Sequence, residues 1–142
     1  MAAFLADTSA WAHGRRPSAP EALRESFGRR LAAGQIATCG PVMWELLHSA
    51  SNGKEYKALR EDLAALDQAP FESSDWERAL DVCQALAEKG GSLHRAPSMP
   101  DAIIAVAAER AGLTVLHYDK DFDLIASVTG QPSEWVAANG TL

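Results

Sequence analysis

Residues 100–122 contain the pattern that most restricts what this chain can fold into. A segment rich in alanine and isoleucine opens with a proline and Asp101 and stops at Gly112, a residue that accepts the left-handed conformation found after helices. Residues 113–116 are mostly apolar and partly β-branched, which is typical of a short strand covered on both faces. Asp101 thus begins a predicted helix and Asp119 follows a predicted strand. Because ligands of open α/β sheets bind at the carboxyl ends of strands, both acids are candidates for one site.

The remaining chain repeats this alternation of short strands and amphipathic helices. We expect further strands at residues 3–6, 35–39, 69–72 and 134–136. We expect helices starting near residue 10 and at residue 41, helices over residues 21–33, 53–67 and 75–89, and a helical turn at 123–126. Ser74 and Glu77 have the spacing of a capping box, and residues 92–99 are predicted as a loop.

This order of elements predicts an α/β fold with a mainly parallel central sheet of about five strands and helices on both faces, a three-layer α/β/α arrangement. The 142 residues suffice for one domain with a real core, and we expect residues 1–142 to form a single domain. The longest apolar run, residues 102–108, is far too short for a membrane span. With no basic leader at the N-terminus, we expect a cytoplasmic protein.

Two more acids occupy positions equivalent to those of Asp101 and Asp119. Asp7 follows the first predicted strand, and Glu45 lies one turn into the helix that opens with Pro41. In a parallel sheet these positions share one edge, so the four carboxylates are expected to converge, with Asp121 close behind. An acid in a first helical turn also offsets the helix dipole, and an Asp after a strand often only forms a turn, so each residue alone has a structural explanation.

Several carboxylates in one place repel one another unless a proton or a cation neutralises them. Oxygen ligands without cysteine or histidine suit Mg²⁺ or Mn²⁺ and not Zn²⁺. Such a site fits metal-assisted phosphodiester hydrolysis. The net charge of −6 argues against a non-specific nucleic-acid binder but not against a nuclease whose metal ions offset part of this charge. Cys39 and Cys83 lack metal-ligand spacing and are interpreted as reduced core residues.

At these acids the sequence resembles the successive motifs of PIN-domain nucleases, and most of all the VapC-type ribonuclease toxins of bacterial toxin–antitoxin pairs. The resemblance rests on four segments in family order: residues 5–10 (LADTSA), 45–47 (ELL), 100–105 (PDAIIA) and 113–122 (LTVLHYDKDF). The ending TGQPSEWV at residues 129–136 extends it over nearly the whole chain.

The resemblance implies a PIN-like fold and an endoribonuclease dependent on Mg²⁺, with Mn²⁺ as a possible substitute. It further implies a homodimer that acts on RNA and is inhibited by a small cognate antitoxin of the VapB type. The acidic set of the family falls on Asp7, Glu45, Asp101 and Asp119, with Asp121 as a further acid of the last motif. The hydroxyl after the first acid falls on Thr8, with Ser9 next to it.

Four basic residues are additional candidates for contacts with the substrate. Arg15 and Arg16 follow the first acidic motif, whereas His94 and Arg95 lie in the loop before Asp101. Each has the alternative of a solvated loop position. The four tryptophans are interpreted as core or dimer-interface residues rather than base-stacking platforms.

Two other classes of function stay open. A PIN-like fold used only for binding would keep the acids for structure. A phosphoryl-transfer or receiver-type α/β domain also gathers acids at strand ends, but it would need a second acid beside Asp7 and a lysine at the end of a late strand. Ala6, Ser9 and Asp119 occupy those positions instead.

Overall fold

A parallel sheet of five short strands forms the centre of the molecule. The computed structural model describes residues 1–142. The strands run in the order β3-β2-β1-β4-β5, and every neighbouring pair is parallel. Their bounds are β1 Phe4–Ala6, β2 Ile36–Thr38, β3 Asp67–Gln68, β4 Thr114–His117 and β5 Ser133–Trp135.

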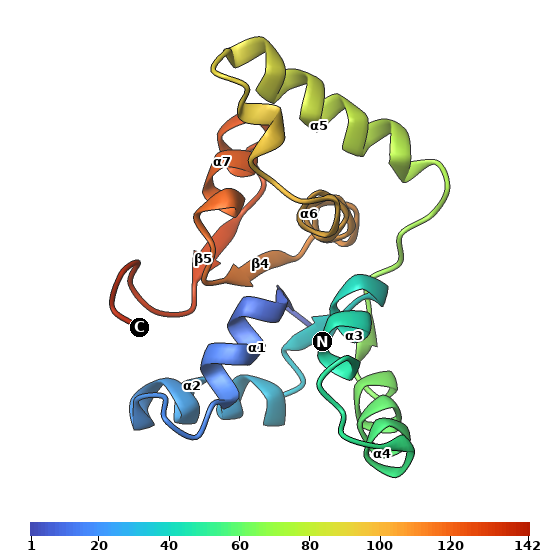
Figure 1. Cartoon of the computed structure of the whole chain (residues 1–142), viewed down its shortest axis with the longest axis vertical. Coiled ribbons are helices and arrows are strands. Elements are labelled where there is room, and N and C mark those ends of the chain that lie inside the picture. The colour runs from blue at the N-terminus through green and yellow to red at the C-terminus, as the bar shows by residue number, and fades with distance from the viewer.

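Seven α-helices cover the two faces of this sheet. They are α1 Thr8–Arg15, α2 Glu21–Ala32, α3 Gly40–Leu47, α4 Gly53–Ala64, α5 Asp75–Lys89, α6 Met99–Ala111 and α7 Lys120–Thr129, with a short 3₁₀ helix at Leu93–Arg95. Helices α1 to α4 lie on one side of the sheet and α5 to α7 on the other (Figure 1). The arrangement confirms the expected three-layer α/β fold with a parallel sheet.

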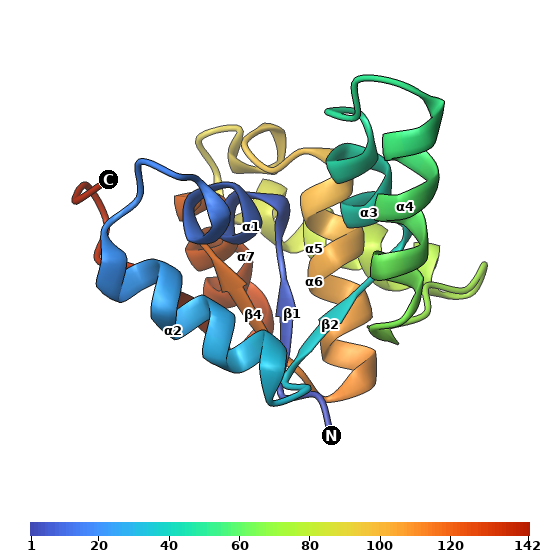
Figure 2. The ribbon, with the colours of Figure 1, turned by 90° about the horizontal axis from the view of Figure 1, so that it is seen from below.

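The order in which strands are added to the sheet reverses at β1. Strands β2 and β3 are added on one side of β1, and β4 and β5 on the other, so β1 lies between β2 and β4 (Figure 2). Leu5 pairs with Ala37 of β2 and with Val115 of β4. Because β1 and β4 are parallel neighbours, the residues that follow them lie at the same edge of the sheet. Open α/β sheets bind ligands at such a place, where the order of the strands reverses.

Helix α6 is the most deeply buried helix. All residues from Ala102 to Ala108 are buried, and the helix contacts β1, β4, α3, α5 and α7. Small alanine side chains allow these neighbours to approach closely. Ser98 caps the amino end, and Gly112, with φ of 69°, ends the helix in the left-handed conformation that glycine tolerates. Asp101 is thereby held at the start of a rigid, enclosed helix.

Four local predictions differ from the structure. Strand β3 forms at Asp67–Gln68, ahead of residues 69–72, and helix α4 already ends at Ala64. Ser74 has helical φ and ψ, which are unlike those of an N-cap residue, and caps nothing with its side chain. The Asp75 carboxylate accepts the Glu72 N–H at 2.8 Å. The turn expected at residues 123–126 is the middle of the longer helix α7. No helix has the length and apolar character needed to traverse a lipid bilayer.

Candidate metal centre at the carboxyl edge of the sheet

An acidic cavity of about 590 Å³ opens at the carboxyl edge of the sheet, beside the ends of β1 and β4. Its wall contains all five acids named from the sequence, together with Thr8 and Ser9. The lining residues are Asp7, Thr8, Ser9, Ala12, Glu45, Ala96, Ser98, Pro100, Asp101, Asp119 and Asp121. Sequence positions more than one hundred residues apart therefore meet in one place.

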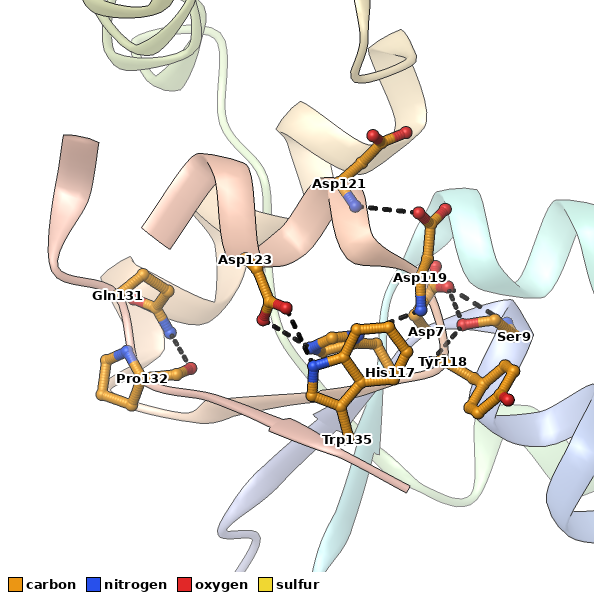
Figure 3. Close-up of polar contacts among 10 residues, drawn as sticks. All are labelled: Asp7, Ser9, His117, Tyr118, Asp119, Asp121, Asp123, Gln131, Pro132 and Trp135. Atoms are coloured by element: carbon orange, nitrogen blue, oxygen red, sulfur yellow. Dashed lines mark hydrogen bonds and ion pairs between the residues drawn. The ribbon is translucent and has the colours of Figure 1, made fainter. Parts of the chain in front are cut away.

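Asp7 is fixed in the cavity by the hydroxyl of Ser9. Asp7 is the N-cap of α1 and only 5% exposed, and its Oδ2 accepts the Ser9 N–H at 3.1 Å and the Ser9 hydroxyl at 2.6 Å. The same hydroxyl accepts the backbone N–H of Tyr118 at 2.9 Å (Figure 3). Ser9 thus ties the end of β1 to the end of β4.

Asp101 is held by a reciprocal capping box at the start of α6. The Ser98 hydroxyl accepts the Asp101 N–H at 3.2 Å, and Asp101 Oδ2 accepts the Ser98 N–H at 3.1 Å. This pair satisfies two N–H groups that a helix start leaves free. It also fixes the side chain of Asp101 while its other carboxylate oxygen has no hydrogen bond.

Asp119 and Asp121 approach Asp101 from the start of α7. Asp119 is the N-cap of α7, and its Oδ1 accepts the Asp121 N–H at 2.9 Å. One carboxylate oxygen from each of Asp101, Asp119 and Asp121 lies within 4.8 Å of the others. These three acids form the tightest group, and Asp7 and Glu45 complete the wall of the cavity.

Burial and mutual repulsion disfavour the charged forms of Asp7, Glu45, Asp101 and Asp121. Burial is the main cause that raises the pKa of Asp7, Glu45, Asp101 and Asp121 above their ordinary values. Neighbouring carboxylates add to the rise: Asp101 acts on Asp7, and Asp119 acts on Asp101. Glu45 is the most exposed of the acids, so water weakens the effect on its pKa.

The donor set of the cavity fits a divalent cation. No lysine, arginine or histidine lines it, and Lys120, which lies beside Asp121, offsets only part of the carboxylate charge. The buried hydroxyl oxygen of Thr8 lies beside the Glu45 carboxylate but meets the geometry of a hydrogen bond with no side chain. A hard cation such as Mg²⁺ binds carboxylate oxygens and keeps several waters, which would satisfy both features.

The four basic candidates lie outside this cavity. Arg15 and Arg16 are exposed at the end of α1, where Arg15 lines a separate apolar groove with Trp11, Leu46, Leu59 and Leu63. His94 and Arg95 are exposed on the 3₁₀ helix. The chain from this helix reaches the cavity only through Ala96 and Ser98.

Two polar residues close to the acids were not singled out from the sequence as site residues. Ser98 lines the cavity, and its spacing of three residues before Asp101 was a readable capping signal. His117 is completely buried at the end of β4, and its Nδ1 accepts the Asp119 N–H at 3.1 Å. In the sequence, its only link to the site is its position two residues before Asp119. A residue at such a position in a strand is ordinarily expected to have a packing role.

Comparison with known proteins places the chain in a family. The family model of the PIN domain matches residues 4–128. Ribonuclease VapC18 of Mycobacterium tuberculosis is 41% identical over 139 residues, covering 98% of both chains. Ribonuclease VapC51 of the same species is 39% identical over 139 residues, covering 98% of this chain and 96% of its own.

Solved structures share the fold at lower sequence identity. The DNA-bound VapBC complex of Salmonella typhimurium contains a chain that superposes with a TM-score of 0.70 and 18% identity, covering 96% of this chain and 100% of that one. A chain of VapBC-5 from Mycobacterium tuberculosis gives a TM-score of 0.58 and 23% identity, covering 95% and 98%. The matched family model, the relatives over nearly full length and the shared fold agree: this chain belongs to the PIN-domain family, among the VapC-type ribonucleases.

Proposed function

We propose that this protein is a metal-dependent endoribonuclease toxin that hydrolyses RNA phosphodiester bonds and is held inactive by a small cognate antitoxin of the VapB type. The observation that carries the proposal is the cavity in which five carboxylates converge without a basic side chain. Its relatives VapC18 and VapC51 are named ribonucleases. Residues 1–142 would act as a single PIN domain.

The proposed catalytic set consists of the acids that line the cavity. Asp7, Glu45, Asp101 and Asp119 would hold Mg²⁺, or Mn²⁺ in its place, and Asp121 would be a further ligand. A bound divalent ion supplies Lewis-acid stabilisation of the phosphodiester charge and promotes attack by water. Ser9 and Ser98 orient two of the acids through hydrogen bonds of 2.6 and 3.1 Å. Such orientation limits the reorganisation that the reaction requires.

The hydroxyl and basic candidates have different proposed roles. Thr8 and Ser9 line the cavity, and we propose that both contact the substrate. The Thr8 hydroxyl would donate to the scissile phosphate or its water. The Ser9 hydroxyl already donates to Asp7, so it would only accept a hydrogen bond from that water. Arg15, Arg16, His94 and Arg95 are exposed outside it, so we propose that they contact phosphates further along the RNA backbone. Exposed arginines bind phosphate oxygens without reading the sequence.

A homodimer is the proposed assembly, and one apolar groove supplies a surface for it. Trp44 is 70% and Met99 64% exposed, and both line a groove with Pro41, Pro100, Ile103 and the cavity acid Glu45. The groove contains no basic residue, which suits a second copy of the chain better than a nucleic acid. Light scattering should give about twice the monomer mass of 15.2 kDa for the wild type and the monomer mass for Trp44→Gln.

A matched variant controls for the loss of an exposed aromatic ring elsewhere. Tyr56 on α4 is 41% exposed and lies outside the groove, so Tyr56→Gln should remain dimeric. A dimeric Trp44→Gln protein would remove this groove from consideration as the interface. A monomeric wild type would contradict the dimer itself.

The ribonuclease proposal is tested by mapping RNA 5′ ends in cells after induction of the protein. New 5′ ends should appear with the wild type and disappear with Asp101→Ala. The exposed Asp62 on α4 gives a matched control, since it does not line the cavity and Asp62→Asn should cleave as the wild type does. With purified protein, cleavage should require Mg²⁺ or Mn²⁺ and stop with EDTA.

The competing function is a catalytically silent PIN-like module that binds RNA or protein. It predicts an inert wild type with every RNA and both metals, or cleavage that survives Asp7→Ala and Asp101→Ala. Either result would refute the nuclease. Antitoxin inhibition is checked separately by co-expression with the product of a short reading frame directly upstream of the gene, which should abolish the new 5′ ends.

A further inference from the structure

His117 is a completely buried polar residue that the proposed chemistry does not use. It is the last residue of β4, and its side chain is 0% exposed. Its Nδ1 accepts the backbone N–H of Asp119 at 3.1 Å. A ring nitrogen that accepts a hydrogen bond carries no proton, so this contact assigns the neutral tautomer with its proton on Nε2.

Aromatic and acidic side chains from α7 and β5 enclose the imidazole. The ring centroid lies 5.1 Å from that of Phe122 and 4.9 Å from that of Trp135. Nε2 lies 3.8 Å from Asp123 Oδ1, beyond hydrogen-bond distance, and Asp123 Oδ2 accepts the indole N–H of Trp135 at 2.9 Å (Figure 3). The imidazole is therefore fixed on the side away from the cavity, and Nδ1 is presented to Asp119.

Asp119 is consequently held at two points. Its N–H donates to His117, and its carboxylate Oδ1 accepts the N–H of Asp121. Its extended backbone, with φ of −151° and ψ of 118°, makes the transition from β4 to α7. The same carboxylate lies within 4.8 Å of those of Asp101 and Asp121. A change in the backbone at Asp119 would thus move one member of the tightest acid group.

We propose that His117 is a positioning residue: its Nδ1 fixes the backbone of Asp119 and thereby directs the Asp119 carboxylate into the cation site. The inference rests on the proposed function, since it concerns the same site. It differs from a packing role, in which any apolar side chain of similar size would serve. It also predicts which nitrogen of the ring matters, because only Nδ1 contacts Asp119.

Three substitutions at this position separate positioning from packing. In His117→Asn the side-chain oxygen occupies the place of Nδ1, two bonds from Cβ, and can still accept the Asp119 N–H. In His117→Gln the amide lies one bond further out, and His117→Leu has no acceptor. Outer groups that orient metal ligands typically change metal affinity by roughly 10-fold to 100-fold. We therefore expect Leu and Gln to weaken Mn²⁺ binding by roughly 10-fold or more, and Asn to stay within about threefold of the wild type.

Calorimetric titration of Mn²⁺ into each protein measures this affinity. Amide hydrogen exchange at Asp119, followed by NMR, reports on the hydrogen bond itself and should be faster in the Leu and Gln variants than in the Asn variant. Urea unfolding identifies any variant that does not fold. If His117→Leu does not fold, the comparison of the Asn and Gln variants, which both carry an amide, still distinguishes a positioning role from a packing role.

Equal Mn²⁺ affinity and equal Asp119 exchange in the Asn and Gln variants would overturn the positioning role, as would unchanged values in a folded Leu variant. Failure of the proposed function gives a different result. In that case the wild type produces no new RNA 5′ ends, while Mn²⁺ affinity and Asp119 exchange still separate the variants. A wild type that binds no Mn²⁺ would overturn the cation site and this role with it.

Discussion

Asp7 is the most deeply buried carboxylate of the cavity, and its burial makes a prediction about pH. Burial, aided by the charge of Asp101, raises the pKa of Asp7 above its ordinary value of 3.8. Between the two values the folded protein binds a proton that the unfolded chain does not, so stability falls as the pH rises through this window. The charged carboxylate therefore destabilises the metal-free protein at pH 7, and this cost vanishes as the pH falls through the raised pKa.

In EDTA, Asp7→Asn should have a larger free energy of unfolding than the wild type at pH 7. The advantage should shrink steadily toward pH 4, because the wild-type carboxyl becomes neutral as well. Urea unfolding at several pH values measures the difference, in which contributions common to both proteins cancel. A variant that is less stable at pH 7, or a difference independent of pH, would contradict the role of burial. Asparagine keeps an oxygen that can accept from Ser9, which limits other effects.

Gly14 allows α1 to approach α2 closely, and only a hydrogen fits there. A Cβ on Gly14 would lie 2.7 Å from Cγ of Phe27, which is itself 1% exposed. Overpacking of this kind costs about 1–3 kcal/mol, so Gly14→Ala should destabilise the protein by that amount.

Gly28 in α2 is the matched control for Gly14. It is exposed and has no atom within 4 Å of an added Cβ, so Gly28→Ala should stabilise the helix by about 0.5–1 kcal/mol. Urea unfolding of both variants measures the contrast. A shift in the same direction for the two would argue against the close contact of α1 with α2.

At the scale of elements, two serines with the same spacing to an acid behave differently. Ser98 caps α6 together with Asp101, whereas Ser74 at the start of α5 makes no capping hydrogen bond. Loss of an N-cap costs about 1 kcal/mol. Ser98→Ala should therefore lower the free energy of unfolding by about that much, and Ser74→Ala by less than about 0.5 kcal/mol. Equal losses from the two variants, measured in urea, would show that the cap does not account for the effect.

The sequence pattern alone did not predict which of the two serines caps its helix. A capping box is a local pattern, and Ser74 fits it with Glu77 three residues later. In the structure the Asp75 carboxylate takes the N–H of Glu72 and also binds Arg110 of α6 at 2.8 Å. The start of α5 is therefore stabilised by a contact with α6 that a local sequence pattern does not contain.

Long helices and buried strands were predictable because their buried positions are occupied by apolar residues at regular spacing. Phe27 and Leu23 in α2 are such signals. Strand β3 has only two residues, both exposed, so nothing apolar marked it. Helix α7 begins with charged residues, and its register becomes visible only from the burial of Phe122 and Ile125.

At the scale of the molecule, the sheet order decides which acids meet. Asp7 and Asp119 follow strands that pair directly, since Ala6 lies opposite Leu116 in the register. A parallel sheet was predictable from the alternation of elements, so convergence at one edge was predictable too. The distances were not, because they depend on how α3 and α6 pack. Proximity in sequence was a poor guide for Arg15 and Arg95, which lie outside the cavity.

The same geometry predicts how a divalent ion changes the stability of the whole protein. A ligand that binds only the folded state adds RT ln(1 + [L]/Kd), about 2.7 kcal/mol at one hundred times Kd. Mn²⁺ at that excess should raise the free energy of unfolding of the wild type by about 2.7 kcal/mol. Asp101→Asn, which removes a charge from the tightest acid group, should lose most of this gain, whereas Asp62→Asn should keep it.

The increase in the free energy of unfolding caused by Mn²⁺ should also depend on pH. It should grow as the pH rises, whereas the stability of the metal-free protein should fall. Protons and the ion compete for the same oxygens, and burial raises the pKa of Asp101 and Asp121. Lowering the pH from 7 to 5 should therefore reduce the gain from Mn²⁺ while the metal-free protein becomes more stable at this site. Thermal unfolding with Mn²⁺ and with EDTA at both pH values tests the crossing of the two trends. A Mn²⁺ gain that is the same at pH 5 and pH 7, or equal in Asp101→Asn and Asp62→Asn, would mean that the ion binds elsewhere.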